Sequence, residues 1–358
     1  MTDSTHHTDR TPAEDTLSPA EAYADFRARA DFARTPLGRF MARTEFEPDD
    51  FQVEACSHLQ EGEDVLVTAP TGSGKTLIAE FAVELARVEG KRVFYTTPIK
   101  ALSNQKFNDL SEVHGAENVG LLTGDTSIRR DAPIIVMTTE VLRNMLYNDM
   151  AGLNDLGFVV LDEVHYLADR FRGPVWEEVI IHLPDRVQMV SLSATVSNVE
   201  EFGAWLREVR GPTTIVSTSH RPVPLVNHVL VGHRMFDLFT HSDSDRIDPA
   251  LNHATRTHGG PRSKRARATR ARFRRPSRTQ VVSSLAEAAM LPAIMFIFSR
   301  NGCDEAVEQY LSTGVDLNSR EEKRIVNAAL ESLREDLADE DLGVLGYHTF
   351  REGLLLGV

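Results

Sequence analysis

One glycine-rich loop constrains the fold of this chain more than any other feature of the sequence. It reads Ala69-Pro70-Thr71-Gly72-Ser73-Gly74-Lys75-Thr76. The loop follows the apolar run from Asp64 to Thr68 and opens a helical pattern, although it begins with alanine where a glycine is usual. Glycines let backbone N–H groups converge on phosphate oxygens, a lysine reaches the β and γ phosphates, and a hydroxyl holds magnesium. Candidates for these roles are Gly72, Gly74, Lys75 and Thr76. Read alone, the loop could also be a chance glycine turn.

Short apolar runs alternate with helical patterns from residue 64 onward, after a helix expected over Ser18 to Ala33. Strands are expected at Val65–Thr68, Arg92–Thr96, Ile134–Met137, Phe158–Leu161 and Val187–Leu192. Helices are expected at Thr76–Arg87, Ala101–Leu110 and Val199–Leu206. This alternation predicts an α/β fold, a doubly wound parallel sheet with both faces covered. In such sheets ligands bind at the carboxyl ends of the strands.

Two acidic residues follow one of the expected strands. The segment Val159-Val160-Leu161-Asp162-Glu163-Val164-His165 places Asp162 at the end of an apolar run. An aspartate there can hold the magnesium ion of a nucleotide, and an adjacent glutamate can deprotonate an attacking water. We therefore expect Asp162 to be a metal ligand and Glu163 a general base. The alternative is an acidic strand end that simply faces water.

A third polar segment, Ser193-Ala194-Thr195, ends the strand expected at Val187–Leu192. Its two hydroxyls could hydrogen-bond the Asp162 region and report the state of the γ phosphate. Read alone, the segment is equally a helix-capping turn.

The net charge of −14 is unevenly distributed along the 358 residues. Nine of the eighteen residues from Pro261 to Arg278 are Lys or Arg and none is acidic, so the remaining residues carry −23. This insert is either a nucleic-acid-binding patch, in which Phe273 could stack on a base, or a disordered linker. The favoured structural interpretation is the linker, which would still be able to bind RNA.

Composition narrows the class of protein. No apolar run approaches the roughly 20 residues of a membrane helix, and the polar, acidic N-terminus is no secretory signal. Two cysteines cannot staple a secreted scaffold. We expect a cytoplasmic protein that has no membrane partner.

A second folding unit is expected near the end of the sequence. Leu291–Phe298 is interpreted as a buried strand from its composition, followed by an Asn301-Gly302 turn and a helix over Cys303–Leu311. A charged amphipathic helix is expected over Glu321–Leu337. This second core looks shorter than a complete doubly wound domain.

The phosphate loop, Asp-Glu-Val-His and Ser-Ala-Thr, in this order on strand ends, resemble the superfamily-two helicases of the DExH-box branch. Further segments resemble the superkiller-type RNA helicases, a subgroup that feeds or partners RNA-degrading machinery. They are Thr96–Lys106, Leu122–Asp125, Thr138–Tyr147 and Arg172–Glu178. The resemblance implies a RecA-like domain that binds Mg²⁺ and ATP and acts on single-stranded RNA, with DNA as the alternative strand.

The resemblance also assigns roles to individual residues. Phe46 and Gln52 match the adenine-sensing segment, where an aromatic ring can stack on the base; a core aromatic is the alternative for Phe46. Together with them, the family pattern assigns nucleotide binding to Thr71, Gly72, Ser73, Gly74, Lys75, Thr76 and Asp162, with Lys75 also catalytic beside Asp162 and Glu163. Magnesium is assigned to Thr76 and Asp162, and coupling between nucleotide and strand to His165, Ser193 and Thr195.

Seven residues fall where the family grips the sugar-phosphate backbone of the strand. They are Pro98, Lys100, Gln105, Gly124, Asp125, Thr138 and Thr139. Hydroxyls, a lysine and helix-start N–H groups suit sequence-independent phosphate contact. For some of them, an ordinary helix cap is the alternative.

The domain organisation predicted from this resemblance has four parts. They are a disordered tail (1–17), a helicase ATP-binding domain (18–235), a basic linker or insertion (236–280) and a partial, truncated second RecA-like domain (281–358). The family's Gln-x-x-Gly-Arg-x-Gly-Arg stretch, which supplies arginines to the transferring phosphoryl group, is not found in the sequence. The chain alone is therefore expected to bind Mg-ATP but to hydrolyse it weakly. The alternatives are a non-enzymatic ATP- and RNA-binding module and a translocase on duplex DNA.

Overall fold

The computed structural model describes residues 18–148, 150–195, 198–232, 234–240, 245–258, 276–335, 338, 342–343 and 346–358. The chain divides into two compact units, Met1–Pro224 and Leu225–Val358. They are called here the first and the second unit, and each is described by itself. The expected tail over residues 1–17 and most of the basic insert, residues 259–275, lie outside the described residues.

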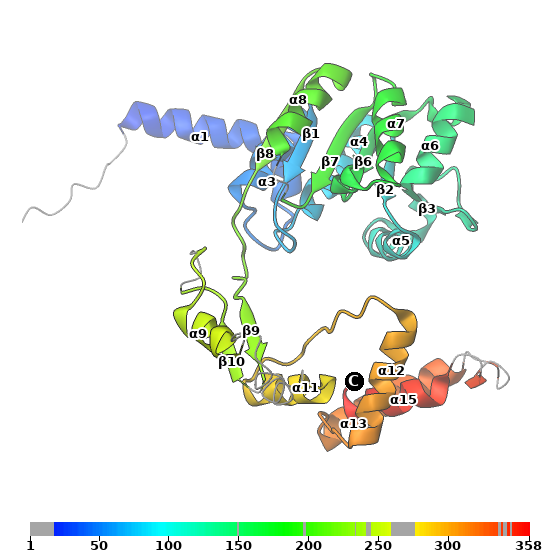
Figure 1. Cartoon of the computed structure of the whole chain (residues 1–358). Helices are drawn as coiled ribbons and strands as arrows, with labels where there is room; N and C mark the ends of the chain where they lie inside the picture. Colours follow the sequence, from blue (N-terminus) through cyan, green and yellow to red (C-terminus); the bar gives the residue numbers. More distant parts are fainter. Residues whose placement is uncertain are drawn as a thin grey trace, which may run out of the picture. The chain divides into compact units, whose positions relative to one another are not determined.

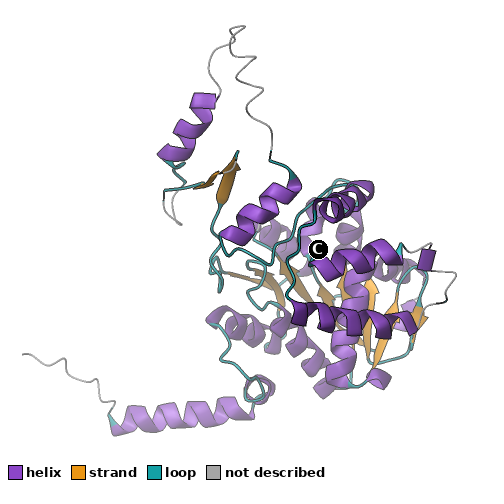
Figure 2. Cartoon of the chain, turned by 90° about the horizontal axis from the view of Figure 1, so that it is seen from below, coloured by secondary structure: helices purple, strands orange, loops and turns teal. Residues whose placement is uncertain are grey.

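The first unit is built on an eight-stranded sheet (Figures 1 and 2). Its strand order is β4-β3-β5-β2-β6-β7-β1-β8, and every pairing is parallel except β3 with β4. The strands are β1 (Asp64–Thr68), β2 (Arg92–Thr97), β3 (Val119–Leu122), β4 (Ser127–Ile128), β5 (Ile134–Thr138), β6 (Leu156–Leu161), β7 (Gln188–Ser193) and β8 (Thr213–Ser217). The predicted α/β fold with a mostly parallel sheet is confirmed.

Helices cover both faces of this sheet. They are α2 (Pro36–Met41), α3 (Asp50–Gln60), α4 (Thr76–Glu89), α5 (Lys100–His114), α6 (Thr139–Asn148), α7 (Gly173–His182) and α8 (Val199–Arg210). Helix α1 (Pro19–Arg34) contacts α2 and extends away from the sheet (Figure 1). Short 3₁₀ turns lie at Ala116–Asn118, Met150–Leu153 and Val164–Ala168. The expected helices over 18–33, 76–87, 101–110 and 199–206 are confirmed.

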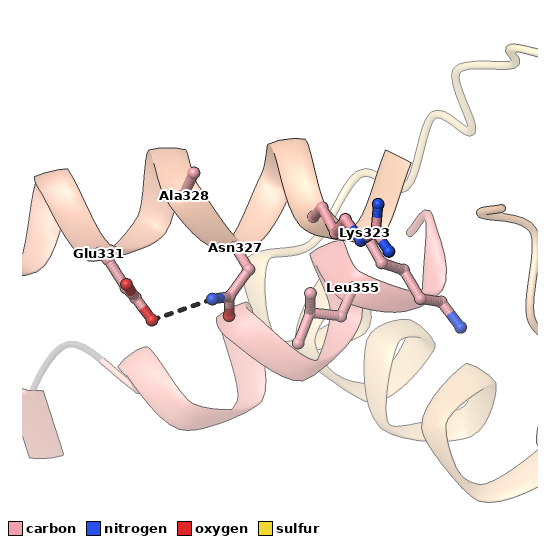
Figure 3. Close-up of a pocket in the computed structure, with 6 residues that line it drawn as sticks. Lys323, Asn327, Ala328, Glu331 and Leu355 are labelled. Atoms are coloured by element: carbon pink, nitrogen blue, oxygen red, sulfur yellow. Dashed lines mark hydrogen bonds between the residues drawn. The ribbon is translucent and has the colours of Figure 1, made fainter. Parts of the chain in front are cut away.

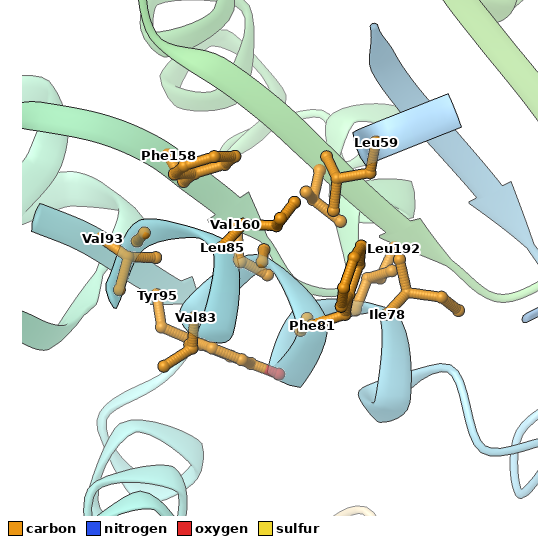
Figure 4. Packing of buried hydrophobic residues seen from close by; sticks show 14 of the residues in the cluster. Leu59, Ile78, Phe81, Val83, Leu85, Val93, Tyr95, Phe158, Val160 and Leu192 are labelled. Atoms are coloured by element: carbon orange, nitrogen blue, oxygen red, sulfur yellow. The ribbon is translucent and has the colours of Figure 1, made fainter. Parts of the chain in front are cut away.

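Alternate side chains of each strand enter opposite cores, as the pleat requires. Val65 and Val67 of β1 belong to one core and Leu66 to the other. Figure 4 shows the first core, where Phe81 of α4 packs beside Leu192 of β7. Because α4 begins where the glycine-rich loop ends, this packing fixes the loop to the sheet.

A buried ion pair holds the start of β1. Asp64 accepts a hydrogen bond from the Met189 N–H at 2.7 Å and another from Arg210 Nε at 3.2 Å. The side chains of Arg210 and Asp64 are 2% and 9% exposed. Arg210 also donates to the carbonyls of Leu183 and Val187, so its charge is fully solvated by protein groups.

The second unit contains a two-stranded antiparallel sheet and helices. The elements are β9 (His228–Val231), β10 (Arg234–Asp237), α9 (Pro249–His258), α11 (Arg278–Glu287), α12 (Arg300–Thr313), α13 (Arg320–Glu335) and α15 (Tyr347–Leu356). Leu330 and Tyr347 lie in its small buried cluster, where the Tyr347 hydroxyl donates to the Leu330 carbonyl at 3.1 Å. A hollow of about 410 Å³ lies against α13 and α15, with Lys323 and Leu355 in its lining. Figure 3 shows these lining residues.

The expected buried strand at Leu291–Phe298 is wrong. The segment is neither strand nor helix, and Ile294, Phe296 and Phe298 are 83%, 79% and 100% exposed. A strand forms only where a neighbouring strand accepts its hydrogen bonds, and among the described residues of this unit β9 and β10 pair only with each other.

The two helices predicted after this segment are confirmed. The helices expected over 303–311 and 321–337 correspond to α12 and α13. The Asn301-Gly302 turn is wrong, because α12 already begins at Arg300 with Ser299 as its cap; the Gly302 N–H donates to the Ser299 hydroxyl at 3.1 Å. Among the described helices, none combines the length and the apolar character that a membrane span requires.

Candidate ATP and nucleic-acid site

The three motifs of the sequence meet at one edge of the first unit's sheet. β6, β7 and β1 are consecutive neighbours, and all three run parallel. Thr68, at the end of β1, is in register with Ser193, at the end of β7. The phosphate loop, Asp162 and Ser193 therefore follow adjacent strands at their carboxyl ends, where α/β sheets bind ligands.

The phosphate loop has the backbone shape that its glycines allow. Gly72 and Gly74 have φ of +84° and +79°, values that residues with a Cβ rarely adopt. Lys75 Nζ donates to the carbonyls of Ala69 and Pro70 at 2.7 and 2.9 Å. The hydroxyl oxygen of Ser73 is buried and has no hydrogen-bond partner in the structure. An unsatisfied buried hydroxyl beside a lysine within such a loop is what a bound phosphate would complete, so the residues fit a nucleotide.

Opposing influences act on the ammonium group of Lys75. Burial lowers its pKa, and the negative charges of Glu163 and Asp162 raise it. The lysine of the loop and the acidic pair after β6 therefore sense each other's charge. This is the arrangement needed to place an anionic phosphate and a cation side by side.

Gln52 lies against the phosphate loop. Its side-chain nitrogen donates to the Gly74 carbonyl at 2.9 Å, and its oxygen accepts from the Asp49 N–H at 2.8 Å, completing the capping box of α3. The side chain is 2% exposed. Both ends of the amide are thus occupied within the chain, and contact with a base would require Gln52 to exchange these bonds.

Phe46 lines a cavity on the surface of α4. The cavity has a volume of about 340 Å³ and runs along α4 to the end of α5. Its lining includes Phe40, Thr44 and Phe46 from the N-terminal segment, Leu77, Glu80, Glu84 and Arg87 from α4, and Val113 and His114 from α5. Phe46 is 58% exposed, so it is not a core aromatic. An exposed aromatic ring at a cavity next to the first turn of α4 is suited to stacking on a planar base.

Asp162 is held in place from three directions. Its N–H donates to the Thr96 carbonyl at 3.0 Å, its Oδ1 accepts from the Glu163 N–H at 2.9 Å, and its Oδ2 accepts from the Tyr95 hydroxyl at 2.9 Å. Carboxylate oxygens are the preferred ligands of Mg²⁺. The structure therefore presents Asp162 as a fixed, partly exposed carboxylate that suits this ion.

Glu163 adopts a left-handed backbone conformation, with φ of 55° and ψ of 42°. Such a conformation is uncommon for a residue with a side chain and is often found at functional sites. His165 Nδ1 lies 3.2 Å from Glu163 Oε2, and both side chains are about one-third exposed. The expected general base and the expected coupling histidine are therefore direct neighbours.

Ser193 and Thr195 differ in their surroundings. The Ser193 hydroxyl, 1% exposed, donates to the Ala194 carbonyl at 2.8 Å, and the Ser193 carbonyl accepts from the Ala69 N–H at 3.2 Å. Its described contact with the site is with the backbone of the phosphate loop, whereas hydrogen bonding to the Asp162 region was expected. Thr195 is exposed.

Four of the expected nucleic-acid residues are exposed together beyond β2 and β3. They are Lys100, Gln105, Gly124 and Asp125. Lys100 Nζ donates to Asp125 Oδ2 at 2.6 Å, and Thr123 donates to Asp125 Oδ1 at 3.0 Å. These bonds, that from Lys100 foremost, lower the pKa of Asp125. A strand phosphate would compete with Asp125 for Lys100.

The other three expected contacts are less accessible. Pro98 is buried, and its carbonyl accepts from Arg172 Nη1 at 3.2 Å. Thr139 is completely buried and its hydroxyl donates to the Thr97 carbonyl at 3.3 Å, so the expected hydroxyl contact of Thr139 with a strand is not possible in this conformation. Thr138 is half-buried at the end of β5.

Two residues near the site were not singled out as site residues. Tyr95 donates to Asp162, and Arg172 connects the segment before α7 to Pro98. No signal in the sequence marks Tyr95, because the pairing of β2 with β6 that brings it to Asp162 is seen only in the structure. Arg172 belongs to the Arg172–Glu178 segment but carried no role.

Comparisons with known proteins show which family this chain resembles. Residues 49–202 match the family described as DEAD/DEAH box helicase. The chain is 53% identical over 337 residues to the probable helicase HelY of Mycobacterium leprae, covering 90% of this chain and 37% of that protein. The chain thus spans little more than a third of the length of that relative.

Two further relatives are more distant. The chain is 39% identical over 321 residues to the human Superkiller complex protein 2, covering 83% of this chain and 25% of that protein. It is 36% identical over 311 residues to the mouse Exosome RNA helicase MTR4, covering 85% and 30% respectively. The chain therefore carries a DEAD/DEAH-box helicase domain and belongs with the superkiller-type helicases of superfamily two.

Proposed function

We propose that this chain binds Mg-ATP at the edge formed by the phosphate loop, Asp162 and Glu163, and couples its hydrolysis to movement along a single nucleic-acid strand. The observation that carries the proposal is the meeting of the three motifs on the adjacent strands β1, β6 and β7. RNA is the proposed strand, because a relative is named as an RNA helicase. DNA is the alternative.

Different residues of the site are proposed to bind the phosphates, to bind magnesium and to accept the proton of the attacking water. Lys75 and the loop N–H groups would hold the phosphates, with Thr76 and Asp162 as the magnesium ligands. Bound magnesium would neutralise charge that develops on the phosphate oxygens. Glu163 would accept a proton from the attacking water. His165, whose Nδ1 lies 3.2 Å from Glu163 Oε2, would couple the nucleotide site to the strand.

The proposed strand contact lies beyond β2, β3 and β5. Lys100, Gln105 and Asp125 are exposed there, and a sequence-independent grip needs such polar groups at helix starts and loops. Ser193 and Thr195 are proposed to report the nucleotide state to this surface. RNA-degrading machinery is the proposed partner, since a relative is named for a superkiller complex and another for an exosome helicase.

The test is ATP turnover by residues 1–358 with and without single-stranded RNA, single-stranded DNA or duplex DNA. Stimulation by RNA supports the proposal, stimulation by duplex supports a DNA translocase, and Glu163→Gln serves as the inactive control. Mg-ATP binding without turnover supports the alternative of an ATP- and RNA-binding module. A chain that binds no Mg-ATP would contradict both.

A further inference from the structure

The edge of the sheet has two halves that meet between β2 and β6. The ends of β3, β5 and β2 carry the proposed strand contacts, and the ends of β6, β7 and β1 carry the proposed nucleotide contacts. β2 and β6 pair in parallel, with Tyr95 opposite Val160 and Thr96 opposite Leu161. A side chain that crosses from β2 to the end of β6 therefore joins the two halves.

Tyr95 is that side chain. It is 1% exposed, and its hydroxyl donates to Asp162 Oδ2 at 2.9 Å. The other oxygen of the carboxylate accepts from the Glu163 N–H, and the Asp162 N–H donates to Thr96. With one donor on each oxygen, the carboxylate is restrained from rotating about its χ2 bond. The remaining lone pair of Oδ2 then points in a fixed direction.

The ring of Tyr95 is itself held by its surroundings. Figure 4 shows it among the buried residues of the first core, between Val83 and Val93 and below Val160. Lys106 Nζ of α5 lies 5.9 Å from the ring centroid, one residue after the proposed strand contact Gln105. Burial, with the charges of Asp162, Glu80 and Glu163, raises the pKa of the phenol, so the hydroxyl keeps its proton and donates it.

A tyrosine inside a core usually owes its place to packing. Phenylalanine fills the same space and lacks only the hydroxyl. The hydroxyl of Tyr95 has a specific acceptor, and that acceptor is the carboxylate proposed to hold magnesium. A packing role and a positioning role therefore differ in one atom, which makes them separable by experiment.

We propose that Tyr95 is a positioning residue that orients the Asp162 carboxylate for the magnesium ion of bound ATP, and that it does so from the strand whose end carries the nucleic-acid contacts. This inference rests on the proposed function. Tyr95 does not touch the nucleotide; it acts through Asp162. Its loss should weaken the contribution of magnesium to nucleotide binding and leave the contacts of the phosphate loop intact.

The test measures binding of a fluorescent ATP analogue to the full chain as a function of Mg²⁺ concentration. In Tyr95→Phe, the Mg²⁺ concentration at half-maximal effect should rise roughly tenfold, the size expected for one hydrogen bond to a charged group. Affinity for the analogue in the presence of a chelator should stay within about twofold of wild type, because Lys75 and the loop are unchanged.

Tyr147→Phe is the matched control. Its phenol, 53% exposed on α6, also meets a carboxylate, that of Glu178, but lies outside the site. Its Mg²⁺ dependence should equal that of wild type. In an Asp162→Asn background, adding Tyr95→Phe should shift the Mg²⁺ midpoint by less than about twofold, because the two residues act through one oxygen.

The outcomes separate this inference from the proposed function. If wild type binds the analogue with Mg²⁺ dependence and Tyr95→Phe has the same midpoint, the positioning role is overturned and the proposed function stands. If Tyr95→Phe loses affinity equally with and without Mg²⁺, the hydroxyl supports the fold rather than Asp162, which also overturns the role. If the wild-type chain does not bind the analogue, the result contradicts the proposed function and therefore also the positioning role of Tyr95.

Discussion

The two units of this chain treat apolar segments in opposite ways. In the first unit β6 is completely buried, with β2 on one side and β7 on the other. In the second unit Leu291–Phe298 is just as apolar, yet its phenylalanines are 79% and 100% exposed. The comparison shows that composition supplies the tendency to be extended and buried, while neighbouring strands decide whether a segment becomes a strand.

The same contrast explains where the candidate site lies. Asp162, Ser193 and the phosphate loop are placed by strands that are paired on both sides and covered by helices. Sites on rigid elements keep their geometry better than sites on loops without such support. The first unit is therefore expected to hold the nucleotide site by itself. Equivalent substitutions in the two units should have different effects on stability and on nucleotide binding.

The largest expected effect is the loss of a core aromatic. Phe81 is completely buried and its ring packs at a tilt against Phe40, with the centroids 5.2 Å apart, so Phe81→Ala should lower the free energy of unfolding of the first unit by about 3–5 kcal/mol. Phe296→Ala should change the free energy of unfolding of the second unit by less than about 0.5 kcal/mol, because Phe296 is exposed. Urea unfolding followed by far-UV circular dichroism reports on the helices of both units, and tryptophan fluorescence reports on the first unit alone, where Trp176 and Trp205 lie. Equal effects of the two substitutions would contradict the comparison.

The next effect concerns ion pairs of the two units. Arg210→Met removes the buried partner of Asp64 and should cost the first unit about 3 kcal/mol, because a carboxylate is left without its partner. Breaking the pair of Lys323 with Asp316 on the second unit, whose side chains are 32% and 47% exposed, should cost less than about 1 kcal/mol. Thermal unfolding of Arg210→Met and Lys323→Met measures the difference. A cost for Lys323→Met that matched the cost for Arg210→Met would be evidence against it.

The third prediction concerns the affinity of the chain for an ATP analogue. Lys75→Ala should weaken binding of an ATP analogue by about a hundredfold or more, because it removes a charge from the phosphate site. Lys323→Ala, which alters a lysine at the hollow of the second unit, should leave the affinity unchanged. Both variants should unfold at the temperature of wild type. Retained affinity in Lys75→Ala would count against the assignment of the loop.

The smallest effect depends on pH. Burial, with the charge of Arg87, lowers the pKa of His114, so the unfolded chain binds a proton at this residue more readily than the folded chain does. The stabilising contribution is present above about pH 6.5 and is lost as the pH falls below it. His114→Gln should flatten this decline by less than about 1 kcal/mol, as measured by urea unfolding between pH 7.5 and 5. His348→Gln, at an exposed position of the second unit, is the control. An unchanged slope in His114→Gln would remove this explanation.

How much the sequence predicts differs between these regions for physical reasons. The strands of the first unit were found because their apolar runs are local signals, and the phosphate loop because its glycines have fixed tasks. The hydrogen bonds of Gln52 and Thr139 were not found, since their partners Gly74 and Thr97 lie 22 and 42 residues away along the chain. The error at Leu291–Phe298 has the same origin, because strand partners are not encoded in the segment itself.

The central claim of this account is that the first unit alone forms the nucleotide site. The proposed domain boundaries and site residues follow from that claim. Hydrogen–deuterium exchange of the whole chain, with and without Mg-ATP, tests this most directly. Slow exchange is predicted for amides of β1 and β6 in both conditions, fast exchange for Leu291–Phe298 in both, and nucleotide-dependent protection at residues 69–76 and around Asp162. Protection of Leu291–Phe298 to the level of β6, or no change at residues 69–76 when Mg-ATP is added, would contradict the account.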